Sequence, residues 1–178
     1  MQRLSCFERV YDVGVVGAGY AGFAAAVTLA EAGQSVLLTC HDGATVWESG
    51  RAFAEEAGEH DGPLWQAWLA ELAERGAAAE GRIDGACAEI VASRWILARK
   101  DRLTPLYYAR PVGVELTPDG LAAVAMATKS GLRRICARRW LDATETGELL
   151  RLVAPDLPAE RLDLLADIGH RGGVRLEA

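Results

Sequence analysis

The stretch YDVGVVGAGYAGFAAAVTLAEAG, residues 11–33, decides the fold that we predict for this chain. Residues 11–16 are apolar, partly β-branched and followed by a glycine, a pattern typical of a short buried strand. Apolar residues then recur at helical spacing, and Gly33 is placed to end that helix. Residues 34–39, QSVLLT, follow as a second strand. The sequence therefore predicts a βαβ unit of about 30 residues.

Three glycines form a G-x-G-x-x-G motif between the first strand and the helix. Gly17 allows a tight turn, Gly19 leaves room for a pyrophosphate, and Gly22 lets the helix pack closely on the strand. The N-terminus of the helix would offer free amides and a positive dipole end to the phosphates. In this context the motif predicts a dinucleotide site. Its residues would be Gly17, Ala18, Gly19, Tyr20, Ala21 and Gly22.

The same stretch could instead be a membrane span or a signal peptide, since residues 13–30 carry no charge and are about long enough to span a bilayer. Four glycines interrupt the run, however, and Asp12 and Glu31 bracket it. No basic segment with a cleavage site precedes it. These features favour the βαβ unit, and we expect no membrane association.

Composition places the chain among soluble globular proteins: 178 residues, 51% hydrophobic and 25% charged, with a net charge of −6. The length suits one domain with a real core. An acidic chain without a basic stretch argues against nucleic acid as a partner. Cys6, Cys40, Cys87 and Cys136 are far apart and include no C-x-x-C. They predict free thiols in a reducing compartment, hence a cytoplasmic protein, and no metal site.

Beyond the βαβ unit, residues 1–9 are expected to be a short lead-in and residues 40–62 a loop of unusual length. Helical periodicity predicts further helices, of which the last two are short or uncertain. They are residues 64–75, 83–101, 146–153 and 159–167. A third parallel strand is expected at residues 106–108.

From Val112 onward the apolar period changes to two, which indicates an antiparallel meander. Turn residues separate its three strands. The strands are expected at residues 112–116, 121–128 and 132–137, and a further strand at 139–141 leads into Asp142, Ala143 and Thr144. The predicted fold is α/β and Rossmann-like, with a central parallel sheet, helices on its faces and the meander covering part of the sheet.

This order of elements resembles the N-terminal FAD-binding half of glutathione-reductase-like flavoproteins, and most of all the branch known as FAD-dependent oxidoreductases. That branch typically reads DVVVVGGGPAG near its start and IDATGDGD at the end of the block. Here residues 12–22 read DVGVVGAGYAG and residues 141–148 read LDATETGE. The resemblance covers about residues 11–153 and implies one domain over residues 1–178, with residues 154–178 as a tail. It implies FAD as the cofactor, with NAD(P) as the weaker alternative.

The resemblance also implies roles for single residues. Gly17, Gly19 and Gly22 would line the FAD pyrophosphate, and Ala143 and Thr144 would lie beside the cofactor. Residues 47–51 would run along the stretch from phosphate to flavin. Arg51, the last of them, would either pair with a phosphate or be a solvated loop charge.

At the end of the second strand the chain departs from the family, which places there a Glu or Asp that accepts hydrogen bonds from the adenosine ribose. Cys40 stands at that position, and a thiol is a poor acceptor. Asp42 could reach the ribose instead and His41 could contribute, or both could be ordinary loop residues.

Two further departures concern the phosphates and the adenine. Glu145 replaces the glycine of the family's A-T-G, and an acid there would repel phosphate. Pro111 lacks an N–H next to Val112, close to where the family offers a backbone amide to adenine. Together, Cys40 and Glu145 predict weak or absent FAD retention.

The sequence offers no general base, redox dithiol or substrate pocket, so we assign no catalytic residue. Family members continue with a substrate domain, which we expect to be absent here. Three functions follow. The chain is a FAD-binding oxidoreductase module, either a fragment or a subunit whose catalytic remainder lies on a second chain. Alternatively, it is a non-catalytic relic or scaffold that has lost cofactor affinity. The third, a small NAD(P)-binding protein, is disfavoured by the meander.

Overall fold

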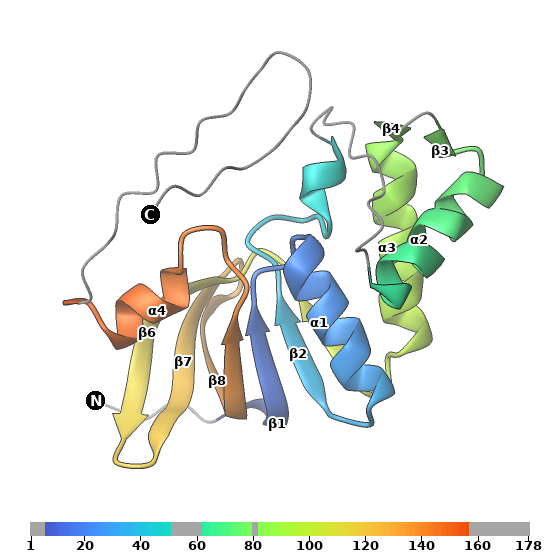
Figure 1. Ribbon diagram of the computed structural model, residues 1–178. Helices are drawn as coiled ribbons and strands as arrows, with labels where there is room; N and C mark the ends of the chain where they lie inside the picture. Colours follow the sequence, from blue (N-terminus) through green and yellow to red (C-terminus); the bar gives the residue numbers. More distant parts are fainter. Residues whose placement is uncertain (1–5, 51–61, 80–81, 157–178) are drawn as a thin grey trace, which may run out of the picture.

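A computed structural model describes residues 6–50, 62–79 and 82–156. One sheet of six strands, in the order β5-β2-β1-β8-β7-β6, organises this part of the chain (Figure 1). Its strands are β1 Cys6–Val16, β2 Val36–Thr39, β5 Leu103–Leu106, β6 Arg110–Thr117, β7 Gly120–Thr128 and β8 Gly131–Asp142. The helices are α1 Tyr20–Glu31, α2 Pro63–Glu74, α3 Gly85–Ala98 and α4 Glu148–Val153, with a 3-10 turn, η1, at Trp47–Gly50. Two short strands, β3 Ala78–Ala79 and β4 Arg82–Ile83, pair separately.

The parallel half of the sheet confirms the predicted βαβ unit. β1 pairs with β2 on one side and with β8 on the other, both in parallel, and β5 continues the parallel order at the edge. The expected third strand at residues 106–108 lies instead at Leu103–Leu106. Pro105 is tolerated there because β5 is an edge strand, where a missing N–H leaves no ladder bond unmade.

Two cores lie on the two faces of the sheet. Val13, Val15 and Leu38 pack with α1, α2 and α3 on one face. Val16 and Leu37, which alternate with Val15 and Leu38 along β1 and β2, pack with the meander on the other face. Figure 1 shows α1–α3 gathered on one side and α4 beside the meander strands. Alternation along buried strands thus produces the two faces that the sequence predicted.

One strand replaces two that the sequence analysis separated. Residues 132–137 and 139–141 form a single strand, β8, which pairs antiparallel with β7 and parallel with β1. No Gly, Pro or Asn interrupts the chain between them, so nothing ends the strand. The meander therefore extends the main sheet. The sheet is also strongly curled, because β5 and β6 form its opposite edges and only residues 107–109 connect them.

The beginning of the chain corrects two expectations. Residues 6–9 belong to β1 and are not a lead-in. Cys6 forms a disulfide with Cys136 of β8, with 5.7 Å between the Cα atoms, whereas Cys40 and Cys87 are free. The expectation of four free thiols was wrong because sequence spacing does not reveal which strands become neighbours. Disulfides are rare in the cytosol, so the cysteines no longer support the predicted cytoplasmic location.

The remaining helices agree with the expected segments. α3 is shorter than residues 83–101 because Asp84 caps it, accepting a hydrogen bond from Cys87 N at 2.8 Å. The possible helix at residues 159–167 lies outside the described residues. Among the residues described, no helix is long and apolar enough to cross a bilayer.

Candidate dinucleotide site

The glycine turn joins the carboxyl ends of β1, β2 and β8. Gly17 N donates to Thr39 O at 3.1 Å, and Ala143 N donates to Val16 O at 2.7 Å. Gly17 has φ +100°, and a Cβ there would lie 2.5 Å from Ala143 O. Only glycine fits such a position. The structure thus brings together the two motifs, G-x-G-x-x-G and D-A-T, that the sequence placed far apart.

The other two glycines meet different neighbours. A Cβ on Gly22 would lie 1.9 Å from Gly17 O, so this glycine lets α1 pack against the turn. A Cβ on Gly19 would lie 2.1 Å from Oε1 of Glu48, which is the end of a side chain. Gly22 is therefore required by the backbone itself. Gly19 instead leaves open a space at the N-terminus of α1 that another group can enter.

Glu48 occupies that space. Its Oε1 accepts a hydrogen bond from the backbone N–H of Tyr20, the first residue of α1, at 2.9 Å. Two neighbouring contacts hold the same segment on the turn: Val46 N donates to Ala18 O at 2.8 Å, and the hydroxyls of Tyr20 and Ser49 are 2.6 Å apart. Ala18 is buried and Tyr20 half-buried. The resemblance placed residues 47–51 along the phosphate, but no spacing rule predicts the bond from Glu48 to a residue 28 positions earlier.

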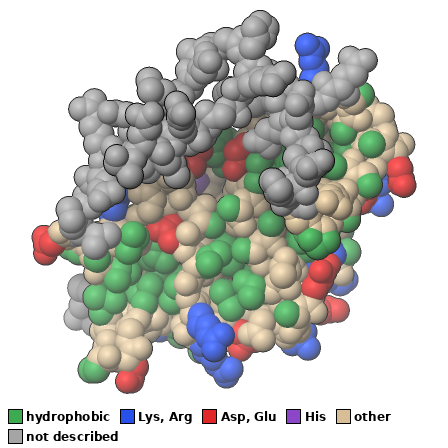
Figure 2. All heavy atoms as spheres, in the orientation of Figure 1, with side chains coloured by type: hydrophobic (Ala, Val, Ile, Leu, Met, Phe, Trp, Pro, Cys, Tyr) green, Lys and Arg blue, Asp and Glu red, His purple; other side chains and the backbone are tan. Residues whose placement is uncertain are grey.

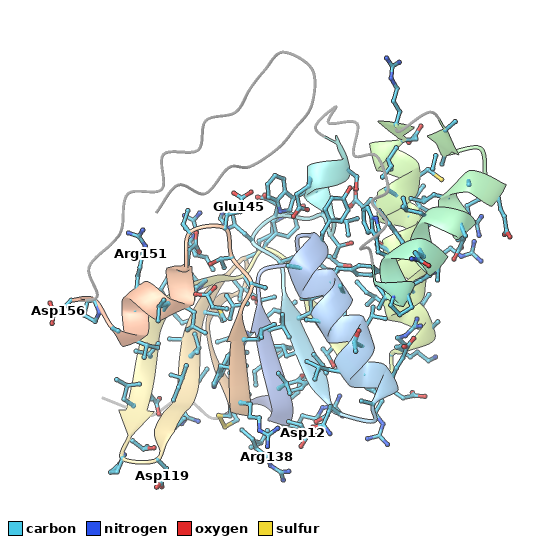
Figure 3. The ribbon with its side chains drawn as sticks, viewed as in Figure 1. Asp12, Asp119, Arg138, Glu145, Arg151 and Asp156 are labelled. Atoms are coloured by element: carbon cyan, nitrogen blue, oxygen red, sulfur yellow. A yellow bond between two sulfur atoms is a disulfide. The ribbon has the colours of Figure 1, made fainter. Side chains whose placement is uncertain are left out.

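The D-A-T segment is organised mainly by α4. Asp142 Oδ1 accepts hydrogen bonds from Thr144 N at 3.0 Å and Thr144 Oγ1 at 2.6 Å. Thr144 Oγ1 in turn accepts from Glu148 N at 2.8 Å. Thr144 is therefore engaged with the start of α4, whereas Ala143 lies against the glycine turn. Glu145 is exposed in the loop between β8 and α4 (Figure 3).

The carboxyl end of β2 differs from what the family pattern implies. Cys40 is 1% exposed and belongs to the core beside α1, and burial raises the pKa of its thiol to about 12. A neutral thiol inside the core is not placed to receive a ribose. His41 and Asp42 are exposed, with 3.9 Å between His41 Nε2 and Asp42 Oδ1. These two residues are the open part of this segment.

Basic groups surround that segment. Arg110 Nη2 lies 2.7 Å from His41 Nε2, at the start of β6. Lys129 Nζ lies 3.3 Å from the ring centroid of Tyr108, whose backbone N donates to Asp42 O at 3.2 Å. The curl of the sheet brings Lys129, from the β7–β8 turn, to the end of β5. Sequence reasoning missed these cations because their approach depends on that curl.

Val112, one of the predicted residues, lies on the edge strand β6 and is 47% exposed. The predicted Arg51 lies outside the described residues. Figure 2 shows apolar side chains grouped on the surface over the meander strands and α4. Among the exposed large apolar residues of β6 and α4 are Val112, Leu116 and Leu150. Within the described ranges, no three His, Cys, Asp or Glu side chains are grouped to hold a metal ion.

The backbone of the turn fits a pyrophosphate, because Gly19 leaves a space next to the first amide of α1. The side chains fit it less well. A carboxylate already accepts from that amide, and the usual ribose acceptor is a buried thiol. The site therefore has a dinucleotide cradle in its main chain, with side chains that oppose an anion at the turn.

Several solved structures share this fold. Glycerol-3-phosphate dehydrogenase from Bacillus halodurans complexed with FAD aligns with a TM-score of 0.62 and 14% identity, covering 81% of this chain and 36% of that chain. Thermovibrio ammonificans THI4 aligns with a TM-score of 0.58 and 18% identity, covering 84% of this chain and 64% of that chain. AlpK aligns with a TM-score of 0.57 and 23% identity, covering 81% and 33%. The chain thus spans 33–64% of the length of these proteins.

No curated protein sequence matches the chain significantly. The sequence does match the family described as FAD dependent oxidoreductase, over residues 12–155. This range runs from the middle of β1 to just beyond α4, and it includes both the glycine turn and the D-A-T segment. The protein therefore belongs to the family of FAD-dependent oxidoreductases.

Proposed function

We propose that this chain is the FAD-binding part of a FAD-dependent oxidoreductase of the glutathione-reductase-like branch. One observation carries the proposal. The glycine turn is held against the D-A-T segment so tightly that side chains at Gly17 or Gly22 would strike backbone atoms. Such a turn at the N-terminus of a helix is suited to a pyrophosphate. FAD would supply the redox chemistry when bound.

The residues then divide by position. Ala18, Gly19, Tyr20 and Ala21 would face the pyrophosphate, with Arg51 as a further candidate. Ala143 would lie along the cofactor beside the turn, with Thr144 next to it. His41 and Asp42, which are exposed at the end of β2, would face the ribose, while Val112 would lie toward the adenine. In this proposal the main chain binds the cofactor and the side chains tune its affinity.

The remaining half of the enzyme would come from a second chain or from further residues. The related structures are longer than this chain, which supports such a division. The exposed apolar side chains of Leu116, Leu132 and Leu150 on the meander side give a partner an apolar surface to cover. We include in the proposal that residues 1–178 form one domain. A cytoplasmic location would require the Cys6–Cys136 disulfide to persist in a reducing compartment.

A second candidate is a non-catalytic relic that keeps the fold but has lost cofactor affinity. The position of Glu48 on the Tyr20 amide favours it, since a carboxylate there competes with phosphate. In that case the protein would serve as a binding or scaffold subunit. The two candidates differ in whether FAD binds at all.

Flavin titration separates them. The purified chain is titrated into FAD, and quenching of flavin fluorescence is followed, with Gly19→Val as the matched control. We expect saturable binding by the unmodified chain and none by the control, because a side chain at position 19 fills the cradle. Absence of saturable binding in the unmodified chain, and also in a variant without the Glu48 carboxylate, would refute the oxidoreductase function.

A further inference from the structure

We propose that the Glu48 carboxylate is an internal occupant of the phosphate position in the glycine turn, and that a dinucleotide binds only by displacing it. The inference rests on the proposed function, since it concerns the same turn. It gives a role to Glu48, a residue of the 47–51 stretch to which neither the motif nor the family pattern assigns one. Glu48 would therefore set the affinity of this site for every ligand that carries a diphosphate.

The contact geometry supports this role. The first N–H groups of a helix have no partner within the helix, and at a dinucleotide turn a phosphate oxygen takes one of them. Here Glu48 Oε1 takes the N–H of Tyr20, at 2.9 Å. Gly19 caps α1 without a side-chain hydrogen bond, and the first turn contains no acidic residue. The negative charge at this helix end is thus supplied from a distant segment.

The backbone around Glu48 is arranged to hold it there. Val46 has φ +48°, a conformation that a β-branched residue rarely adopts. Such strain persists only where the surrounding structure imposes it, and it is concentrated at functional sites. Val46 N and Ser49 Oγ are both bonded to the turn, and the Tyr20 ring packs edge-on against Trp65 at 4.9 Å. Glu48 is therefore held on both sides.

The carboxylate and a phosphate exclude each other. Both are anions, and both need the space that the missing side chain of Gly19 leaves free, where Glu48 Oε1 lies 2.1 Å from the position of a Cβ. A dinucleotide must break the bond to Tyr20 N and move the charge aside. Gln at position 48 would keep the shape and the acceptor but remove the charge, and Ala would remove all three.

Affinities should therefore rise in the order unmodified chain, Glu48→Gln, Glu48→Ala. We expect about tenfold tighter FAD and ADP binding for Glu48→Gln and about a hundredfold for Glu48→Ala. Adenosine, which has no phosphate, should bind equally to all three. Glu74→Ala removes the same charge from an exposed position on α2 and should change nothing. Adding Gly19→Val to Glu48→Ala should abolish the gain, because it refills the same space.

Isothermal titration of FAD, ADP and adenosine with these variants, each checked by circular dichroism for folding, is the test. Equal FAD affinity in the unmodified chain and both Glu48 variants would overturn the inference while leaving the proposed function intact. A gain for ADP without any binding of FAD would support the inference and refute the FAD function. No gain for either ligand overturns the inference. If Glu48→Ala does not fold, the inference is tested by Glu48→Gln alone, for which a tenfold gain in affinity is expected and no gain would overturn it.

Discussion

The two ends of the candidate dinucleotide site differ in what the fold has preserved. At the glycine turn the backbone is constrained, because side chains at Gly17 or Gly22 would strike main-chain atoms. At the carboxyl end of β2, the position of the usual acid is a buried cysteine, and the nearby exposed cations are Arg110 and Lys129. Relative to the family pattern, a carboxylate, Glu48, is added at the phosphate end, and the acid that ends β2 is replaced by a buried thiol. Close packing of the backbone therefore restricts which residues the glycine turn can contain, whereas the exposed side chains near the end of β2 meet no such restriction.

The largest expected effect separates two glycines of the same turn. Gly22→Ala should lower the free energy of unfolding by about 4 kcal/mol or more, because its Cβ would lie 1.9 Å from Gly17 O. Gly19→Ala should cost about 1 kcal/mol or less, since φ there is −64° and only the end of the Glu48 side chain must shift. Urea unfolding measures both variants. Similar losses of stability for the two variants would contradict the assignment of Gly22 to packing and of Gly19 to ligand binding.

Next comes the adenosine end, where Cys40→Glu restores the acid of the family. Because Cys40 is 1% exposed within the core, we expect the variant to lose about 3 kcal/mol or more of stability through burial of a carboxylate. Cys40→Ala, the control, should lose about 1 kcal/mol. Urea unfolding and FAD titration are run together. A stable Cys40→Glu protein with tighter FAD binding would show that the side chain at position 40 reaches the ligand. It would contradict the statement that the β2 end has lost its ribose acceptor.

A smaller effect concerns alkaline pH. The pKa of the Cys40 thiol is 9.0 in the unfolded chain, and burial raises it to about 12 in the folded protein, so above pH 9 the unfolded state binds fewer protons. Stability should therefore fall as pH rises through this window, by up to about 1.4 kcal/mol per pH unit. Tyr11 and Tyr107 also have pKa values raised by burial, and they act in the same direction. The difference between the unmodified chain and Cys40→Ala at pH 8, 9 and 10 isolates the thiol. Parallel curves would contradict the burial of Cys40.

The smallest effect tests the curl that brings the basic groups together. Lys129 lies over the Tyr108 ring, and Lys129→Ala should cost about 0.5–1 kcal/mol. Lys100→Ala, at an exposed position just after α3, serves as the control and should be neutral. Thermal unfolding, measured in replicate, would resolve the expected difference in stability between the two variants. If the two variants behave alike, the β7–β8 turn does not reach the end of β5 in solution.

The sequence was a good guide where the signal is local. The βαβ unit, the glycine turn, α2 and α4 follow from periodicity and turn residues within short windows. It failed where the structure depends on which strands become neighbours. The Cys6–Cys136 disulfide, the single strand β8 and the approach of Lys129 to Tyr108 all arise from the register and curl of the sheet. Glu48 belongs to the same class, since its partner is 28 residues away in the sequence.

The disulfide also makes part of the chain a closed covalent ring. The bond joins residues separated by 130 positions. The ring therefore contains the glycine turn, β2, β5, β6 and β7, whereas the D-A-T segment and α4 follow it in the sequence and are not part of it. A single protease cut inside the ring leaves both pieces attached, and a cut between residues 137 and 147 releases α4 as a separate peptide. Limited proteolysis resolved on gels with and without reductant would therefore show which side of the ring is cut first.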